Sequence, residues 1–152
     1  MKKRFISLCL VAVLSLALFI PAHAEYIPEE SVSSVIVMGN GITVEITLIV
    51  HNTSTVSRAA STKTASKTAV YKYNGAEIAT IVIDASFGYN GTSSWVNSAS
   101  VSKSVASGWT YSGESLTNFG GTATVTATLS KLFTPNVNVN TSITCSPAGA
   151  IS

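Results

Sequence analysis

Apolar side chains recur at every second residue in three separate stretches of this chain, residues 42–50, 122–132 and 137–145. Because successive side chains of a β-strand point to opposite faces, this period of two predicts strands with one buried face. Ser and Thr account for 39 of residues 25–152, Val and Ile are frequent, and the helix former Gln is absent. The sequence therefore predicts an all-β fold, an antiparallel β-sandwich or open barrel of about six to eight strands.

The N-terminal segment has the layout of an export signal. Lys2, Lys3 and Arg4 give it a positive start. An apolar run over 5–20 follows, and residues 21–24, Pro-Ala-His-Ala, place small side chains where a signal peptidase cuts. This order of charge, apolar run and small residues predicts a cleaved signal peptide and a secreted, extracellular protein.

Removal of the signal peptide, residues 1–24, changes the charge of the chain. Six basic and seven acidic residues remain in 25–152, so the net charge becomes −1. Nucleic-acid binding needs a clustered basic surface, and we expect no nucleic-acid partner. The apolar run over 5–20 is short for a spanning helix and no later run is longer. We therefore expect 25–152 to form a single β-sandwich domain with no stable membrane span after cleavage.

Cys145 is the one cysteine left once the signal peptide, with Cys9, is removed. An intramolecular disulfide and a multi-cysteine zinc site are therefore excluded for the mature domain. The chain also lacks a His, Asp and Glu cluster at metal-ligand spacing, a Gly-rich phosphate loop and a dinucleotide fingerprint. We expect no metal and no cofactor.

The first strands are predicted around a Gly-Asn-Gly turn at 39–41, which makes residues 33–50 a hairpin. A short helix over 28–38 is the alternative, because a proline and two glutamates suit the first turn of a helix. Residues 51–68 have no apolar stripe of either period. They predict a loop, or a polar edge strand whose lysines discourage pairing with another sheet.

The middle of the chain predicts a hairpin and a bulge. A short strand over 68–73 ends at Asn74-Gly75, a strong turn signal, and residues 76–89 read as a central strand covered on both faces. A two-residue loop at Asn90-Gly91 would pair Phe87 with Ser94, and the bulky residues that follow would then lie one position out of register with the Phe87 face. An odd-length loop with a left-handed Gly91 and a bulge would place Trp95 on the Phe87 face.

The C-terminal part predicts a short strand and then a long hairpin. Residues 108–111 read as a short strand and 112–121 as turn-rich chain. Residues 121–146 form two alternating arms around a turn at 134–136, and the second arm places Cys145 on its apolar face. The low charge of 122–129 also makes this stretch a candidate for strand addition into fibres.

Several segments between residues 85 and 152 resemble a group of small exported β-rich proteins of Gram-positive, Clostridia-like bacteria. That group has no established activity, so the resemblance implies no catalytic residue. Its members often carry a second cysteine after the Tyr-Asn-Gly turn. This chain has Ser-Trp-Val-Asn at 94–97, so a family-type disulfide to Cys145 lacks its second cysteine. The segments that carry the resemblance are 85–93, 98–102, 108–109, 121–127 and 142–152.

Catalytic constellations are sparse. A Ser-His-Asp site would have to use His51 and Asp84, the one histidine and the one aspartate after residue 24, and a thiol dyad would have to pair His51 with Cys145. A loop histidine and a solvent-facing carboxylate explain the first pair more simply, and a small buried hydrophobe explains the cysteine. We therefore expect that this protein is not an enzyme. Paired carboxylates for glycoside cleavage would have to come from Glu45, Glu77, Asp84 and Glu114.

Four aromatic residues near turns form the possible binding surface: Tyr89, Trp95, Trp109 and Tyr111. They would stack on sugar rings if exposed, or fill the core of the sandwich if buried. The function that the sequence favours is an extracellular or cell-surface binding module for a protein or a glycan. The alternative is a membrane-active, pore-forming β-hairpin at 121–146, and a hydrolase ranks third.

Overall fold

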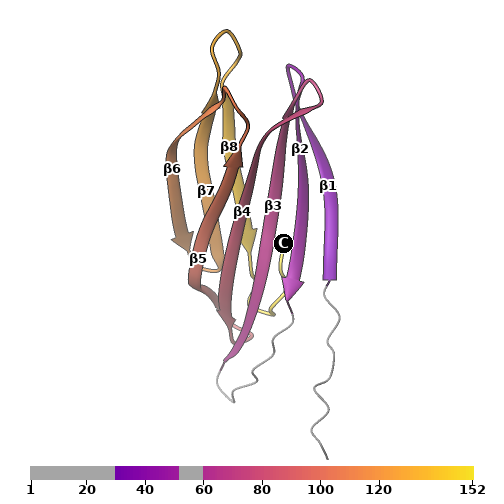
Figure 1. Ribbon diagram of the computed structural model, residues 1–152. Helices are drawn as coiled ribbons and strands as arrows, with labels where there is room; N and C mark the ends of the chain where they lie inside the picture. Colours follow the sequence, from indigo (N-terminus) through magenta and orange to yellow (C-terminus); the bar gives the residue numbers. More distant parts are fainter. Residues whose placement is uncertain (1–29, 52–59) are drawn as a thin grey trace, which may run out of the picture.

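The computed structural model describes residues 30–51 and 60–152, and it confirms the predicted fold class (Figure 1). Eight antiparallel strands and no helix make up this part of the chain. The predicted signal peptide lies outside the described residues. In chain order the strands are β1 (Glu30–Gly39), β2 (Ile42–His51), β3 (Ser61–Tyr73), β4 (Ala76–Tyr89), β5 (Ser94–Val105), β6 (Thr110–Phe119), β7 (Thr122–Ser130) and β8 (Val137–Thr144).

The strands form two sheets that pack face to face as a sandwich. Strands β1-β2-β3-β4-β5 form one sheet in chain order, and β6-β7-β8 form the other. The core lies between them, where alternate residues of β2, β4, β7 and β8 are buried. Its largest side chains are fully buried: Tyr71, Phe87, Ile81, Ile83, Leu129, Ile143, Val125, Val137 and Val139.

Both predicted hairpins at the two ends of the chain are confirmed. Strands β1 and β2 pair around the turn at 39–41, so the alternative helix over 28–38 is wrong for its described part, 30–38. Strands β7 and β8 pair in the same way, with the threonine face of β7 turned away from the core. The stretch 122–129, a predicted candidate for strand addition into fibres, is not a free edge, because β7 is the middle strand of its sheet.

Strand β3 contradicts the prediction of a loop or an edge strand over 51–68. It lies between β2 and β4 from Ser61 onward, while residues 52–59 lie outside the described part. The pattern failed because two inward positions carry lysines. Lys67 donates to the main-chain oxygen of Ser142 at 2.7 Å, and Lys63 donates to that of Gly149 at 2.7 Å. Their stems line the gap between the sheets while their ammonium groups reach the opposite layer.

Strand β4 is the central strand that the sequence predicts, but only one of its faces is covered. The outer face is open, since Asp84 is exposed and Val82 is half-buried. Asn74 and Gly75, with φ of 50° and 82°, form the predicted tight turn before it. One bulge follows: Tyr71 pairs with Ala79 and Lys72 with Glu77, which leaves Ile78 as an extra residue that is also buried.

The register after β4 differs from the prediction. Tyr89 pairs with Ser94, so the connecting loop is the four residues 90–93 rather than an odd number. Gly91 is left-handed as predicted, with φ of 85°. The bulge lies inside β5 at Asn97, because Phe87 pairs with Val96 while Ser86 pairs with Ser98.

The four-residue loop reverses the predicted position of Trp95. Trp95 pairs with Gly88, and its ring therefore lies on the outer face, opposite to the Phe87 face. The extra residue at Asn97 then returns Ala99 and Val101 to the core face. One bulge thus allows an outward tryptophan and an inward apolar stripe in the same strand.

Strand β6 corrects the prediction for 108–121. The chain is a strand from Thr110 to Phe119 rather than a short strand followed by turns. Its interruption is a bulge at 113–114, where Gly113 has a left-handed φ of 66°. Small polar residues on a largely exposed strand gave no alternation that sequence reasoning could detect.

A buried hydrogen bond links the two sheets through the core. The Tyr71 hydroxyl of β3 lies 3.1 Å from the Thr141 hydroxyl of β8, and both residues are buried. Each buried hydroxyl satisfies the other, so loss of either one leaves a buried polar group without this partner.

We expect Tyr71→Phe and Thr141→Val each to lower the free energy of unfolding by about 1–2 kcal/mol. The double variant should lose less than the sum of the single losses, by roughly 1 kcal/mol, because the two hydroxyls serve each other. Urea unfolding of the four proteins measures this cycle. Strictly additive losses would show that the two groups do not interact.

Candidate functional site

The four aromatic residues singled out from the sequence lie at two ends of the sandwich. Trp109 packs edge-on against Tyr73, with ring centroids 5.9 Å apart, at the end where β3 turns into β4. Tyr89 and Trp95 lie at the other end of β4. The structure therefore brings these residues together in pairs and does not gather all four on one surface.

The pair near the β3–β4 turn is largely structural. Trp109 is half-buried, with the Lys131 ammonium 6.0 Å from its ring centroid. Tyr111 is half-buried on β6, and Lys103 lies 4.5 Å from its ring centroid. Burial, with a smaller effect of the nearby Glu114 carboxylate, raises the pKa of Tyr111 to about 12. These contacts fix both rings by cation–π interactions and packing.

Tyr89 and Trp95 differ from each other. Tyr89 is half-buried against Gly149 in the C-terminal segment, with the Lys63 ammonium 6.0 Å from its ring centroid. Trp95 lies on the outer face of the five-stranded sheet and is 37% exposed. Its ring covers Gly88 so closely that no side chain fits there, and its indole N–H donates to Asn97 at 2.9 Å. Of the four rings, Trp95 is the one held flat and open to solvent.

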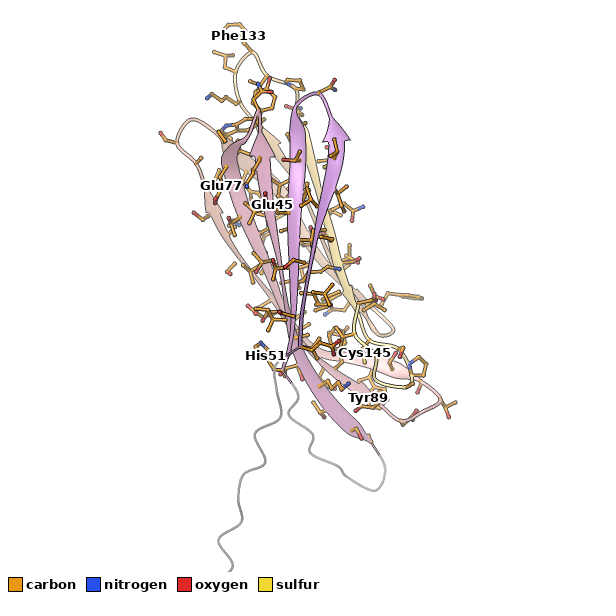
Figure 2. The ribbon with its side chains drawn as sticks, turned by 90° about the vertical axis from the view of Figure 1, so that its right-hand side faces the viewer. Glu45, His51, Glu77, Tyr89, Phe133 and Cys145 are labelled. Atoms are coloured by element: carbon orange, nitrogen blue, oxygen red, sulfur yellow. The ribbon has the colours of Figure 1, made fainter. Side chains whose placement is uncertain are left out.

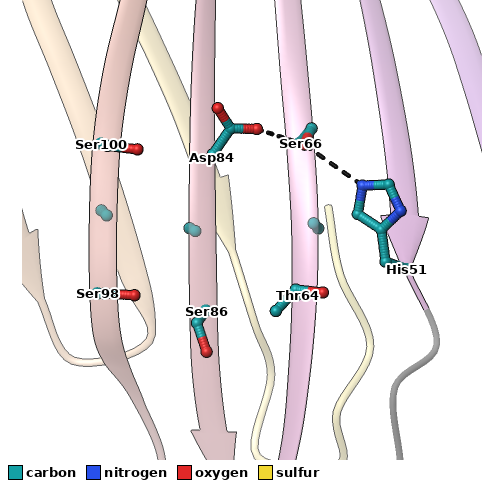
Figure 3. Close-up of a pocket in the computed structure, with 10 residues that line it drawn as sticks. His51, Thr64, Ser66, Asp84, Ser86, Ser98 and Ser100 are labelled. Carbon is teal, nitrogen blue, oxygen red and sulfur yellow. Dashed lines mark hydrogen bonds between the residues drawn. The ribbon is translucent and has the colours of Figure 1, made fainter.

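A polar hollow lies beside Trp95 on the same outer face. Its volume is about 380 Å³, and it crosses β2 to β5 (Figure 3). Serine and threonine hydroxyls come from neighbouring strands because Ser66, Asp84 and Ser100 are paired in register, as are Thr64, Ser86 and Ser98 in the next row. Ser86 is two residues from Gly88, so the hollow and the Trp95 ring lie on the same face, about 7 Å apart along β4.

The hollow brings His51, Ser66 and Asp84 together. The Ser66 hydroxyl donates to Asp84 Oδ1 at 2.5 Å, and His51 Nε2 lies 3.4 Å from Ser66 Oγ (Figure 3). An activated serine donates its proton to a histidine that a carboxylate orients. Here the serine stands in the middle and its proton points to the carboxylate. The arrangement matches a hydrogen-bonding surface and does not match a nucleophilic triad.

The other acid and thiol candidates stand apart from this hollow. Cys145 is 1% exposed in the core, where burial raises the pKa of its thiol. Glu45 pairs with Lys72 at 2.5 Å, and Glu77 accepts from the Thr80 hydroxyl at 2.6 Å. Figure 2 shows both glutamates well away from His51. Glu114 pairs with Lys103 at 2.6 Å, and this contact lowers the pKa of Glu114 below its ordinary value.

The β7–β8 loop presents a second unusual surface. Leu132 is 78% exposed and Phe133 is 97% exposed at its tip, which Figure 2 shows at the end opposite to Tyr89. Phe133 also has a left-handed φ of 61°. A bulky residue in this conformation costs roughly 1 kcal/mol or more, which marks the tip as a place where stability is not the dominant demand.

No three His, Cys, Asp or Glu side chains in 30–51 and 60–152 gather where they could hold a metal ion. Over the same two ranges, no helix is both long and apolar enough to cross a membrane. Comparison with protein-family models, with curated proteins and with solved structures found no match to this chain.

Sequence reasoning paired His51 with Asp84 as members of a possible Ser-His-Asp site, but it did not place Trp95 near them. Their neighbourhood depends on the register of four strands and on the Asn97 bulge. The rows of serine and threonine on β3 and β5 were visible as composition, but no spacing along the chain shows that they face the same side. The register of four consecutive strands, β2 to β5, creates this surface.

Proposed function

We propose that this protein is an exported, non-enzymatic binding module that takes a glycan chain on the outer face of β3, β4 and β5. The observation that carries the proposal is Trp95, an open indole ring beside a hollow lined with hydroxyls and one carboxylate. An aromatic platform with a few placed polar groups is the usual composition of a small-ligand site. The export signal over 1–24 supports an extracellular place of action.

The Trp95 ring supplies the apolar part of the site. A pyranose ring has a face of C–H groups that packs against an aromatic face, and a rigid indole loses little entropy on binding. Gly88 lets the ring lie against the sheet, and the bond from its N–H to Asn97 fixes its orientation. The ring is therefore pre-organised for a flat apolar ligand surface.

The hollow supplies the polar part of the site. Asp84 accepts a hydrogen bond from Ser66 through one oxygen and is exposed, so its carboxylate has further acceptor capacity for sugar hydroxyls. Serine and threonine hydroxyls both donate and accept, which suits a polyol. From Gly88 to Asp84 the strand spans about 13 Å, so the surface suits a short oligosaccharide segment.

We expect one or more polysaccharides to retard the protein in affinity electrophoresis, and calorimetry with a matching oligosaccharide to give its Kd. Trp95→Ala should raise this Kd by at least about 30-fold, because it removes the stacking platform. Asp84→Asn should raise it by about five- to tenfold. Trp109→Phe is the matched control and should leave the Kd unchanged, because Trp109 packs on Tyr73 near the β3–β4 turn, at the end of β4 opposite to Trp95.

Two results would contradict the glycan site. One is the absence of retardation by any polysaccharide in the panel, and the other is unchanged affinity in Trp95→Ala. Far-UV circular dichroism of each variant shows whether the fold is retained, so that loss of binding is not confused with unfolding. Binding of a protein partner that Trp95→Ala abolishes would keep the surface but reject the ligand class.

Membrane contact through the β7–β8 tip is a second candidate function. Leu132 and Phe133 are exposed together, and Lys131 beside them adds a positive charge for anionic headgroups. The two arms of the β7–β8 hairpin, unlike its tip, are buried on one face, since Val125 and Ile143 lie in the core. A membrane-inserted hairpin would therefore have to leave the sandwich, whereas contact through the tip needs no refolding.

Sedimentation with vesicles of phosphatidylglycerol and phosphatidylcholine tests this candidate. Leu132→Ser with Phe133→Ser should weaken vesicle binding at least about tenfold, because two apolar side chains no longer enter the interface. Phe119→Ser is the matched control, since Phe119 is 90% exposed at the opposite end of β7. Equal binding by all three proteins contradicts a tip contact, and absence of dye release at micromolar protein contradicts pore formation.

A further inference from the structure

Strand β1 is an open edge of the five-stranded sheet. It pairs with β2 on one side, and no described strand pairs with it on the other (Figure 1). All ten of its residues are exposed. Five of the nine exposed large hydrophobic residues of the described chain belong to it: Val32, Val35, Ile36, Val37 and Met38.

Between Ser31 and Val37 this edge lacks the usual protection against strand pairing; its one charge lies at Glu30, and the one irregularity in its pairing with β2 lies between Val37 and Gly39. Natural edge strands carry charges, prolines or bulges that prevent another strand from adding to them. From Ser31 to Gly39 there is neither a charge nor a proline. The register with β2 is uninterrupted from Glu30 to Val37, so the strand is regular along most of its length. Its free main-chain groups are therefore presented as a template for a further strand.

The inner face of β1 is uncovered as well. Val32 and Ile36 are 56% and 48% exposed, although Val44 and Leu48 on the neighbouring strand are 4% and 8% exposed. The three-stranded sheet thus covers β2 and stops short of β1. Apolar side chains exposed on both faces of one strand are typical of a surface that a partner buries.

We propose that a second copy of this chain pairs with this edge, β1 against β1 in antiparallel orientation about a two-fold axis near Ser34 and Val35. The product is a dimer with one continuous ten-stranded sheet. Closed two-fold pairing is the commonest arrangement of homo-oligomers, and each copy offers the same strand to the other.

Charge favours a second copy as the occupant. In a two-fold antiparallel pair, a charged residue near the axis meets its own copy and is repelled. Glu30, at the outer end of β1, is the one charged residue of the strand, and the pairing places it opposite the other end of the partner strand. The same symmetry brings Val32 of one copy near Ile36 of the other on the inner face, so apolar groups left open in the monomer cover each other.

The dimer has a consequence for binding that rests on the proposed glycan site. A two-fold axis perpendicular to the sheet leaves both outer faces on the same side, so two hollows face one direction. Two linked sites bind a repetitive polymer more tightly than one site does. The pairing itself does not depend on this ligand, and its test needs none.

Sedimentation velocity of the purified protein, expressed as the full chain, tests the dimer. Wild type should sediment as a dimer at micromolar concentration. Val35→Lys with Val37→Lys should raise the dimer Kd at least about 30-fold, because like charges then meet across the axis. Ser102→Lys with Ser104→Lys adds the same charge to the exposed outer face of β5 and should leave the dimer intact.

Single cysteines test the geometry. An antiparallel pair should form an inter-chain disulfide with cysteine at position 34 or 35, and none with cysteine at position 31 or 37, since only residues at the axis meet their own copies. Cys145 is 1% exposed, so its buried thiol should not form an inter-chain disulfide in these variants. Parallel in-register pairing would cross-link at all four positions and would overturn the two-fold arrangement.

Three further outcomes overturn the proposal. A wild-type monomer at several hundred micromolar removes the dimer, and a dimer that survives the β1 lysines places the contact elsewhere. Open-ended oligomers instead of a dimer would mean a head-to-tail contact between different edges. Because none of these measurements uses a glycan, they succeed or fail separately from the proposed function.

Discussion

Burial of one face of each sheet is the constraint on which the rest of the structure depends. The gap between the sheets must be filled with apolar side chains at every second residue, since a slip of one residue turns the whole set outward. Extra residues at Ile78 and Asn97 let the chain keep this rule where its pattern changes phase. Both are accommodated as bulges, which insert one residue and leave the flanking pairs in register.

The outer face and the open edge of the five-stranded sheet are formed by residues that the core does not bury. Phe87, Ala99 and Val101 point into the core. The residues that alternate with the inward side chains of β4 and β5 therefore point outward and can carry hydroxyls and charge. The four-residue loop at 90–93 places Trp95 on that outer side, and the Asn97 bulge returns Ala99 and Val101 to the core. Among the described residues, the three-stranded sheet leaves β1 of the five-stranded sheet uncovered, so the proposed dimer through β1 and the proposed glycan surface use separate parts of the same sheet.

Local pattern predicted those strands whose inward face is uniformly apolar, and it failed where that face is mixed. The arms within 121–146 were correct because Val, Ala and Leu alternate with Thr. The second half of β3 was predicted as the strand over 68–73, but its first half was not predicted as an inner strand, because Lys63 and Lys67 point inward and bond to main-chain oxygens of the opposite layer. The position of Trp95 depends on the length of the loop at 90–93, which sequence reasoning took as odd. The hollow depends on the register of four consecutive strands and on a bulge at Asn97 that no local signal marks.

The most direct test of this account is the environment of Trp95, read from tryptophan fluorescence in Trp109→Phe, which leaves Trp95 as the sole tryptophan. The account predicts a red-shifted emission that acrylamide quenches readily, because the ring lies on the outer face and is 37% exposed. The companion variant Trp95→Phe should report a less accessible Trp109, held against Tyr73. A blue-shifted emission from Trp95 that acrylamide does not quench would place the ring on the core face and contradict the register.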